Sequence, residues 1–213
     1  MSHYSRKRRP FVKIGLWILV GMIVLGLLGS TLAWYLGSDS GQQPITETPS
    51  SEEDMFTSEI EKQEALREQY EEMLANKPED LTILTGYARV EMGLGELYLQ
   101  NQEESLGKEA FQRAATLYQK ALEKENDLQL RLELASAYQL LSDDSKAEEE
   151  LNKVLEQDPG NINALAQKGI LLESREDWDE AVKAWESVAD SPQADEMTKE
   201  IAEARIKAIK EQE

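Results

Sequence analysis

The chain has 213 residues, no cysteine, one histidine and 42 acidic against 23 basic side chains, which gives a formal net charge of −19. Without thiols, the sequence excludes disulfides and cysteine-ligated zinc. A chain this acidic repels phosphate backbones, so we expect no nucleic-acid partner.

The charges are distributed very unevenly along the chain. Residues 1–36 carry five basic side chains and no acidic one, whereas the remaining residues carry 18 basic against 42 acidic side chains. Such an excess of acid most often serves solubility. It also repels anionic lipid headgroups, so we expect the C-terminal part to stand away from a membrane surface rather than lie on it.

An uncharged apolar segment of 23 residues, 14–36, follows the basic residues. As a helix it would extend about 35 Å, enough to cross a hydrocarbon core of about 30 Å. Trp17 near one end, and Trp34 with Tyr35 at the other, are typical of interfacial aromatic belts. We therefore predict a transmembrane helix over residues 14–36 that contacts the lipid bilayer. The alternative is a cleavable signal peptide, whose apolar stretch is usually shorter, about 7–15 residues.

The same segment contains two overlapping pairs of small residues, Gly26 with Ser30 and Gly29 with Ala33. Pairs with this spacing let two helices approach closely in lipid. Small residues are also common in membrane spans that do not pair. The sequence therefore leaves homo-oligomerisation open.

The flanks of the apolar segment predict its direction across the membrane. A basic tail, residues 1–13, precedes it, and a flexible acidic tether, residues 37–55, follows it. The positive-inside bias keeps such a tail in the cytoplasm. We therefore expect a single-pass membrane protein with a cytoplasmic N-terminus and an extracytoplasmic C-terminal domain, in the periplasm or outside the cell.

Apolar residues recur at helix-face spacing from residue 56 onward. We predict a half-repeat over residues 56–78, in which the first helix of a hairpin is missing. An irregular repeat over residues 81–125 follows, with Asp80 as the N-cap of its first helix. That helix contains three glycines, Gly86, Gly93 and Gly95. Each weakens an isolated helix by about 1 kcal/mol, and together they indicate either close packing or a bend.

Two consecutive 34-residue units, 128–161 and 162–195, come next. Small and large residues fall at fixed offsets in the first unit: Leu134, Ala135, Tyr138, Ala147, Leu151, Val154 and Pro159. The second unit repeats these offsets with Gly169, Leu172, Ala181, Trp185 and Val188, and its Pro192 comes one residue early. A 34-residue period with a small residue in mid-repeat and a proline near the end is the signature of tetratricopeptide (TPR) repeats. The chain therefore resembles the TPR family.

This resemblance implies an all-α fold, a TPR-type helical-hairpin solenoid, here placed after an N-terminal transmembrane helix. We expect the TPR domain to span residues 56–213. Small residues such as Ala135 and Ala181 would let helices nest, and large ones such as Tyr138 and Trp185 would fill the spaces between hairpins. Family members of this kind present a groove to a polypeptide.

Capping residues predict where the later helices begin. Asn126 or Asp127, and then Asn161, are candidate N-caps for the first helices of the two regular units. We predict a C-terminal capping helix over residues 192–211, with Ser191 as its N-cap and Pro192 in its first turn. A polar terminal helix keeps a stacked array soluble.

In the TPR family, four positions of each first helix line the groove. Carried onto this chain, these positions are the peptide-groove candidates Thr82, Thr85, Arg89, Met92, Gln129, Leu132, Ser136, Gln139, Asn163, Ala166, Ile170 and Glu173. The set mixes amides, hydroxyls, aliphatic groups and one arginine, and it lacks the lysines of TPR domains that clamp a C-terminal carboxylate. We expect Leu132→Glu with Ile170→Glu to weaken client capture while sparing the fold.

No residue pattern indicates catalysis, a cofactor or a metal. The only histidine, His3, precedes the apolar segment, which excludes Ser-His-Asp arrangements and histidine metal sites. The sequence has no glycine-rich phosphate loop. Carboxylates occur in runs such as residues 148–150, which are typical of solvated helix faces. We therefore expect a protein that is not an enzyme.

The sequence favours a membrane-anchored TPR scaffold or adaptor that binds protein or peptide clients, themselves membrane-associated or secreted. It resembles bacterial membrane-anchored TPR proteins that accompany the Sec translocon, and less closely the apoprotein-holding subunit of cytochrome c maturation. The expected role is extracytoplasmic protein secretion, envelope assembly or maturation. The alternative is an organelle-membrane TPR receptor with cytosol-facing repeats.

Overall fold

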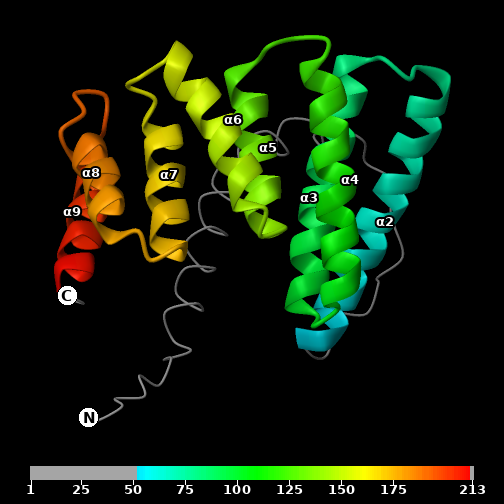
Figure 1. Cartoon of the computed structure of the whole chain (residues 1–213). Coiled ribbons are helices and arrows are strands. Elements are labelled where there is room, and N and C mark those ends of the chain that lie inside the picture. Colours follow the sequence, from blue (N-terminus) through cyan, green and yellow to red (C-terminus); the bar gives the residue numbers. More distant parts are fainter. Residues whose placement is uncertain (1–51, 212–213) are drawn as a thin grey trace, which may run out of the picture. The chain divides into compact units, whose positions relative to one another are not determined.

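The computed structural model describes residues 52–211, with side chains from residue 56 onward (Figure 1). This range contains eight α-helices and no strand. In chain order they are α2 (Glu52–Asn76), α3 (Leu81–Gln100), α4 (Glu104–Leu122), α5 (Leu128–Leu140), α6 (Asp144–Gln157), α7 (Ile162–Ser174), α8 (Trp178–Ala189) and α9 (Glu196–Lys210). None of these helices combines the length and the apolar character that a membrane crossing requires. The predicted basic tail, transmembrane helix and small-residue pairs lie outside the described residues.

Each described helix packs against the next one in sequence. The pairs α3–α4, α5–α6 and α7–α8 form antiparallel hairpins, with α2 against α3 and α9 against α8 (Figure 1). Helix α5 also contacts α7, so the first helices of successive hairpins meet. The described residues therefore form an all-α stack of helical hairpins, which confirms the fold class that the sequence predicts for this part of the chain.

The last two hairpins repeat each other at a spacing of 34 residues. Helices α5 and α7 begin at Leu128 and Ile162, and helices α6 and α8 begin at Asp144 and Trp178. The N-caps of α5 and α7, Asp127 and Asn161, keep the same spacing, and each side chain accepts a hydrogen bond from a first-turn backbone N–H. Asn126 is not the cap of α5, because its side chain accepts from Arg131 instead. The repeat thus extends from the sequence pattern to the backbone.

The turn inside each hairpin has a left-handed residue that is not glycine. Gln102, Ser142 and Glu176 have φ values of 64°, 59° and 65°. In each turn the next backbone N–H donates to a carbonyl five residues back, at 2.7 Å in the first hairpin and 2.9 Å in the other two. This is the Schellman closure of a helix, whose hydrogen bond offsets the cost of about 1 kcal/mol for a left-handed side chain.

Small residues lie where helices approach most closely. Ala135, Ala147 and Ala181 are completely buried. A Cβ atom on Gly169 would lie 2.7 Å from the Trp185 ring, so only glycine fits there as the chain stands. The first and second helices of a hairpin nest at these points.

The α3–α4 hairpin is longer than the others, and neighbouring aromatic rings account for two of its three glycines. Its helices have 20 and 19 residues, against 13 and 14 in α5 and α6. A Cβ on Gly86 would meet the Tyr70 ring, and one on Gly95 would meet the Phe111 ring, whereas Gly93 has open space around it. Close packing therefore accounts for Gly86 and Gly95, and nothing in the structure explains Gly93.

Two predicted boundaries are wrong. Helix α9 begins at Glu196 rather than at residue 192, because Asp195 is its N-cap and accepts from the Thr198 backbone N–H at 2.8 Å. Ser191 is buried, and its hydroxyl oxygen accepts from the Gln193 N–H in a turn before the helix. Helix α2 begins at Glu52, so the last residues assigned to the tether are helical. Acidic residues are favoured in a first helical turn, which is consistent with this earlier start.

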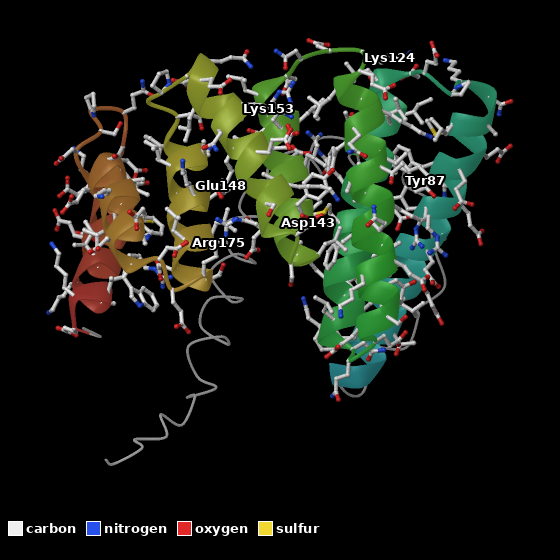
Figure 2. All side chains as sticks on the ribbon, in the orientation of Figure 1. Tyr87, Lys124, Asp143, Glu148, Lys153 and Arg175 are labelled. Atoms are coloured by element: carbon white, nitrogen blue, oxygen red, sulfur yellow. The ribbon has the colours of Figure 1, made fainter. Side chains whose placement is uncertain are left out.

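Ion pairs join helices both between successive hairpins and within one hairpin. Arg175 at the end of α7 contacts Glu148 of α6 at 2.5 Å, and both side chains can be followed in Figure 2. Arg131 of α5 contacts Glu150 of α6 at 2.6 Å, with both side chains largely buried. Burial reduces solvent screening, so these pairs resist salt better than exposed ones.

Candidate peptide-binding face

The groove candidates lie on the first helices α3, α5 and α7, and their exposure follows their position along each helix. The second residue of each helix is exposed in all three cases: Thr82, Gln129 and Asn163. These side chains offer hydroxyl and amide groups to solvent. Arg89 is also exposed, and Thr85, Ser136, Gln139 and Ala166 are half-buried.

The three large apolar candidates are buried. Met92, Leu132 and Ile170 are only 6%, 3% and 7% exposed, and Leu132 belongs to the main hydrophobic core. A glutamate at position 132 or 170 would have to bury a carboxylate, which costs several kcal/mol. The expectation that Leu132→Glu with Ile170→Glu spares the fold is therefore wrong.

The only arginine among the candidates already has a partner. Arg89 Nε donates to Glu133 Oε2 at 3.0 Å, and Nη2 donates to Oε1 at 2.8 Å, which joins α3 to α5. These hydrogen bonds raise the pKa of the Arg89 guanidinium above its usual value. Gln129 also donates to Glu133, at 3.4 Å. A bound peptide would meet a neutralised pair here rather than a free cation.

Glu173 closes the end of the array instead of facing a partner. Its carboxylate accepts from Arg205 of α9 at 3.0 Å and 2.5 Å, and from Trp185 Nε1 of α8 at 2.7 Å. The Arg205 guanidinium also lies over the Trp185 ring. One carboxylate thus ties α7, α8 and α9 together, and its side chain is only 12% exposed.

The half-buried polar candidates bond within the array. Gln139 of α5 donates to the backbone carbonyl of Gln167 in α7 at 3.2 Å. Ser136 and Thr85 donate to carbonyls of their own helices, at 3.1 Å and 2.9 Å. Apart from the paired Arg89, the exposed polar candidates are therefore Thr82, Asn163 and Gln129, of which Gln129 keeps its 3.4 Å hydrogen bond to Glu133. They suit reversible hydrogen bonding to a polypeptide, and no group of three or more His, Cys, Asp or Glu side chains in residues 56–211 is arranged to hold a metal.

A polar hollow of about 330 Å³ adjoins one of these exposed side chains. Its lining comes from the loop before α7, the start of α7 and the start of α9: Asp158, Asn161, Ile162, Asn163, Gln193, Asp195 and Thr198. The hydrogen bond to the Thr198 side chain lowers the pKa of Asp195. The hollow widens the polar surface around Asn163.

Sequence reasoning missed Glu96, which lies one helical turn beyond Met92 on α3. The family pattern assigns four positions to a first helix, but α3 is longer and adds a turn to the same face. Glu96 is half-buried, and burial raises the pKa of its carboxyl to about 7. The predicted length of this first helix could have indicated that one more turn, with Glu96, lies on the same face.

The raised pKa of Glu96 predicts that the stability of the domain depends on pH. Unfolded glutamate has a pKa of about 4.3, so the native state holds the proton more tightly than the unfolded state. The stability that Glu96 contributes is therefore present below about pH 4 and is lost as the pH rises through about 7. Glu96→Gln should be more stable than wild type by about 1–2 kcal/mol at about pH 8, with allowance for partial exposure, and by almost nothing near pH 4.5.

Urea unfolding at several pH values measures this difference. Glu156→Gln, at an exposed position on α6, is the matched control and should show no such trend. A Glu96→Gln difference that is independent of pH would contradict the prediction.

Comparisons with known proteins find distant likenesses among solved structures. No family model matches the chain, and no curated protein matches it. The crystal structure of MamA has 15% sequence identity over 76% of this chain and 94% of that chain, with a TM-score of 0.47. YrrB, described as a TPR protein with an unusual peptide-binding site, has 19% identity over 71% and 88% of the two chains, with a TM-score of 0.37.

A third solved structure, MamA MSR-1 C2, has 18% identity over 75% of this chain and 95% of that chain, with a TM-score of 0.35. These likenesses are too distant to transfer a site. The repeat architecture rests here on the chain's own 34-residue spacing of helices, caps and turns.

Proposed function

We propose that this protein is a membrane-anchored TPR scaffold that binds protein or peptide clients outside the cytoplasm. The observation that carries the binding role is the matching exposure of Thr82, Gln129 and Asn163 on three successive first helices. Polar groups at equivalent positions along contacting helices form a row that can hold an extended chain by hydrogen bonds. The single arginine of this face is neutralised, which favours clients held without a charged terminus.

The anchor is proposed from the sequence. Residues 14–36 are long and apolar enough to cross a bilayer, and the basic residues before them favour a cytoplasmic N-terminus. The helical domain would then act in protein secretion, envelope assembly or maturation. Its acidic surface would keep it away from anionic lipid headgroups and available to clients.

Two experiments test the membrane topology and the client-binding role separately. In the first, a reporter that works only outside the cytoplasm is fused after Glu213, and we expect it to be active. If instead only a reporter that works in the cytosol is active at this position, the proposed membrane topology is wrong. That result would leave the binding role unaffected.

In the second experiment, a photo-crosslinking residue replaces Gln129 or Asn163 in the full chain in cells. We expect both positions to capture extracytoplasmic proteins. Ser187, an exposed residue on the second helix α8, is the matched control and should capture far less. Equal capture at all three positions would show that this face is not the client site.

A further inference from the structure

The last helix of the array, α9, exposes a row of apolar side chains to solvent, which we call the α9 stripe (Figure 1). Its members are Met197, Ile201, Ala204 and Ala208, and Met197 and Ile201 are 69% and 38% exposed. Their spacing of four, three and four residues is the pattern of a seam between two paired helices. At 3.6 residues per turn, the stripe lies about a third of a turn from the side that α9 packs against α8.

Helix α9 is also nearly neutral in a strongly acidic domain. It carries three acidic and four basic side chains, whereas residues 52–211 as a whole carry 39 acidic and 18 basic ones. At the other end of the array, α2 carries nine acidic and two basic side chains. Two copies of such a domain repel each other over most of their surface. On α9 this repulsion is weak, and an apolar stripe is exposed at the same place.

One edge of the α9 stripe carries one charge of each sign. Glu200 and Lys207 are seven residues apart, so they lie on the same side of the helix, but about 10 Å along it separates them. Glu200 makes no ion pair with the described residues. Lys207 has only Glu211, at 4.0 Å, with side chains 77% and 69% exposed, and such exposed pairs contribute little. This edge therefore has a free acid and a weakly held base.

We propose that two copies of this chain pair through α9, with the two helices antiparallel. The twofold axis passes at the level of residues 202 and 203, the middle of the α9 stripe. Ile201 then lies opposite Ala204 of the second copy, and Met197 lies opposite its Ala208. A twofold axis makes each of these contacts twice, so each stripe is covered by the other.

The charges at the edge of the stripe select a second copy as the occupant. When two copies of one helix pair antiparallel, the same edge of each lies against the other. The midpoint of Glu200 and Lys207 is within one residue of the middle of the stripe, so each Glu200 comes opposite Lys207 of the other copy. A parallel pair would bring Glu200 beside Arg205, whose guanidinium is already held by Glu173. The antiparallel pair therefore matches the charges that are available.

The small size of this contact predicts a weak dimer. Helix α9 has 15 residues, about 22 Å, and half of the stripe is alanine, which places the contact among interfaces that bury less than about 1,200 Å². The dimer should dissociate at the low concentrations of circular dichroism, so it adds little to the melting temperature. Pairing does not depend on the membrane anchor or on client binding, although confinement to a bilayer would raise the effective concentration. A paired assembly would present two of the proposed client faces.

Cysteine crosslinking tests the pairing, because the chain has no cysteine of its own. The full chain with Ala204→Cys, close to the proposed axis, is treated with a short bismaleimide in detergent micelles over a range of protein concentrations. We expect a crosslinked dimer. Ala65→Cys, at an exposed position on α2, measures random collision and should crosslink far less. Equal crosslinking at the two positions would overturn the proposal.

A matched pair of methionine substitutions tests the apolar stripe. Met197→Glu, introduced beside Ala204→Cys, should lower the yield of dimer to the level of Ala65→Cys. Met73 is also an exposed methionine, on α2, and Met73→Glu should leave the yield unchanged. Both positions are exposed, so neither substitution should alter the circular dichroism spectrum. An unchanged yield in Met197→Glu, or an equal loss in Met73→Glu, would contradict pairing through α9.

Exchanging the two charges tests both the second copy and its direction. Glu200→Lys alone, or Lys207→Glu alone, places like charges opposite each other at two points and should lower the yield about threefold to tenfold. Both substitutions in one chain restore opposite charges and should return the yield to within about twofold of the starting value. Parallel pairing, or contact between the stripe and detergent alone, predicts no such recovery. Failure of the double exchange to recover the yield would therefore overturn the proposal.

Discussion

Ala181→Glu is expected to unfold the helical domain. Ala181 is completely buried near the start of α8, and its equivalent one repeat earlier, Ala147, is buried as fully. A glutamate there would either bury an unpaired carboxylate or push α8 away from its neighbours. We expect a loss of about 3–5 kcal/mol, a large part of the 5–15 kcal/mol that stabilises a typical domain.

Thermal melts followed by circular dichroism measure this loss. For a domain of this size, we expect the melting temperature to fall by about 10–20 °C, or the cooperative transition to disappear. Ala208→Glu is the matched control, because Ala208 is exposed on α9 and the same charge there should change little. A melting temperature unchanged by Ala181→Glu would mean that the 34-residue register is wrong.

The register could be predicted because it depends on residue size. Buried alanines, with large residues such as Trp185 and Leu151 at matching offsets, recur at 34 residues, and the helices follow them. The N-caps Asp80, Asp127 and Asn161 were also predictable, since short polar side chains favour that position.

The turns between paired helices could not be predicted in the same way. Gln102, Ser142 and Glu176 adopt left-handed backbone conformations for which glycine or asparagine is the usual signal. The hydrogen bonds that close each helix compensate for the missing glycine. For α9, Ser191 before Pro192 is a common helix start and was the predicted N-cap, but Asp195 caps the helix instead.

Exposure of the candidate face was the least predictable feature. A family position says where a side chain lies on its helix, but neighbouring hairpins decide whether solvent reaches it. Leu132 and Ile170 are buried in this chain, whereas Gln129 and Asn163 are not. The Glu91–Arg113 pair joins two helices, and no local pattern indicates it.

The glycines of α3 provide a paired prediction of opposite sign. A Cβ on Gly95 would lie 2.6 Å from Cδ1 of Phe111, a ring that is completely buried and has no room to move. Gly95→Ala should therefore destabilise the domain by about 1–3 kcal/mol through overpacking. Gly93→Ala meets nothing within 4 Å and should stabilise it by about 0.5–1 kcal/mol, because alanine loses less backbone entropy in a helix.

Urea unfolding of the two variants beside wild type measures the contrast, which should reach about 2–4 kcal/mol between them. The two positions share one helix and one substitution, so helix propensity alone predicts the same gain at both. If Gly95→Ala were stabilising as well, α3 and α4 would not approach as closely as the structure has them.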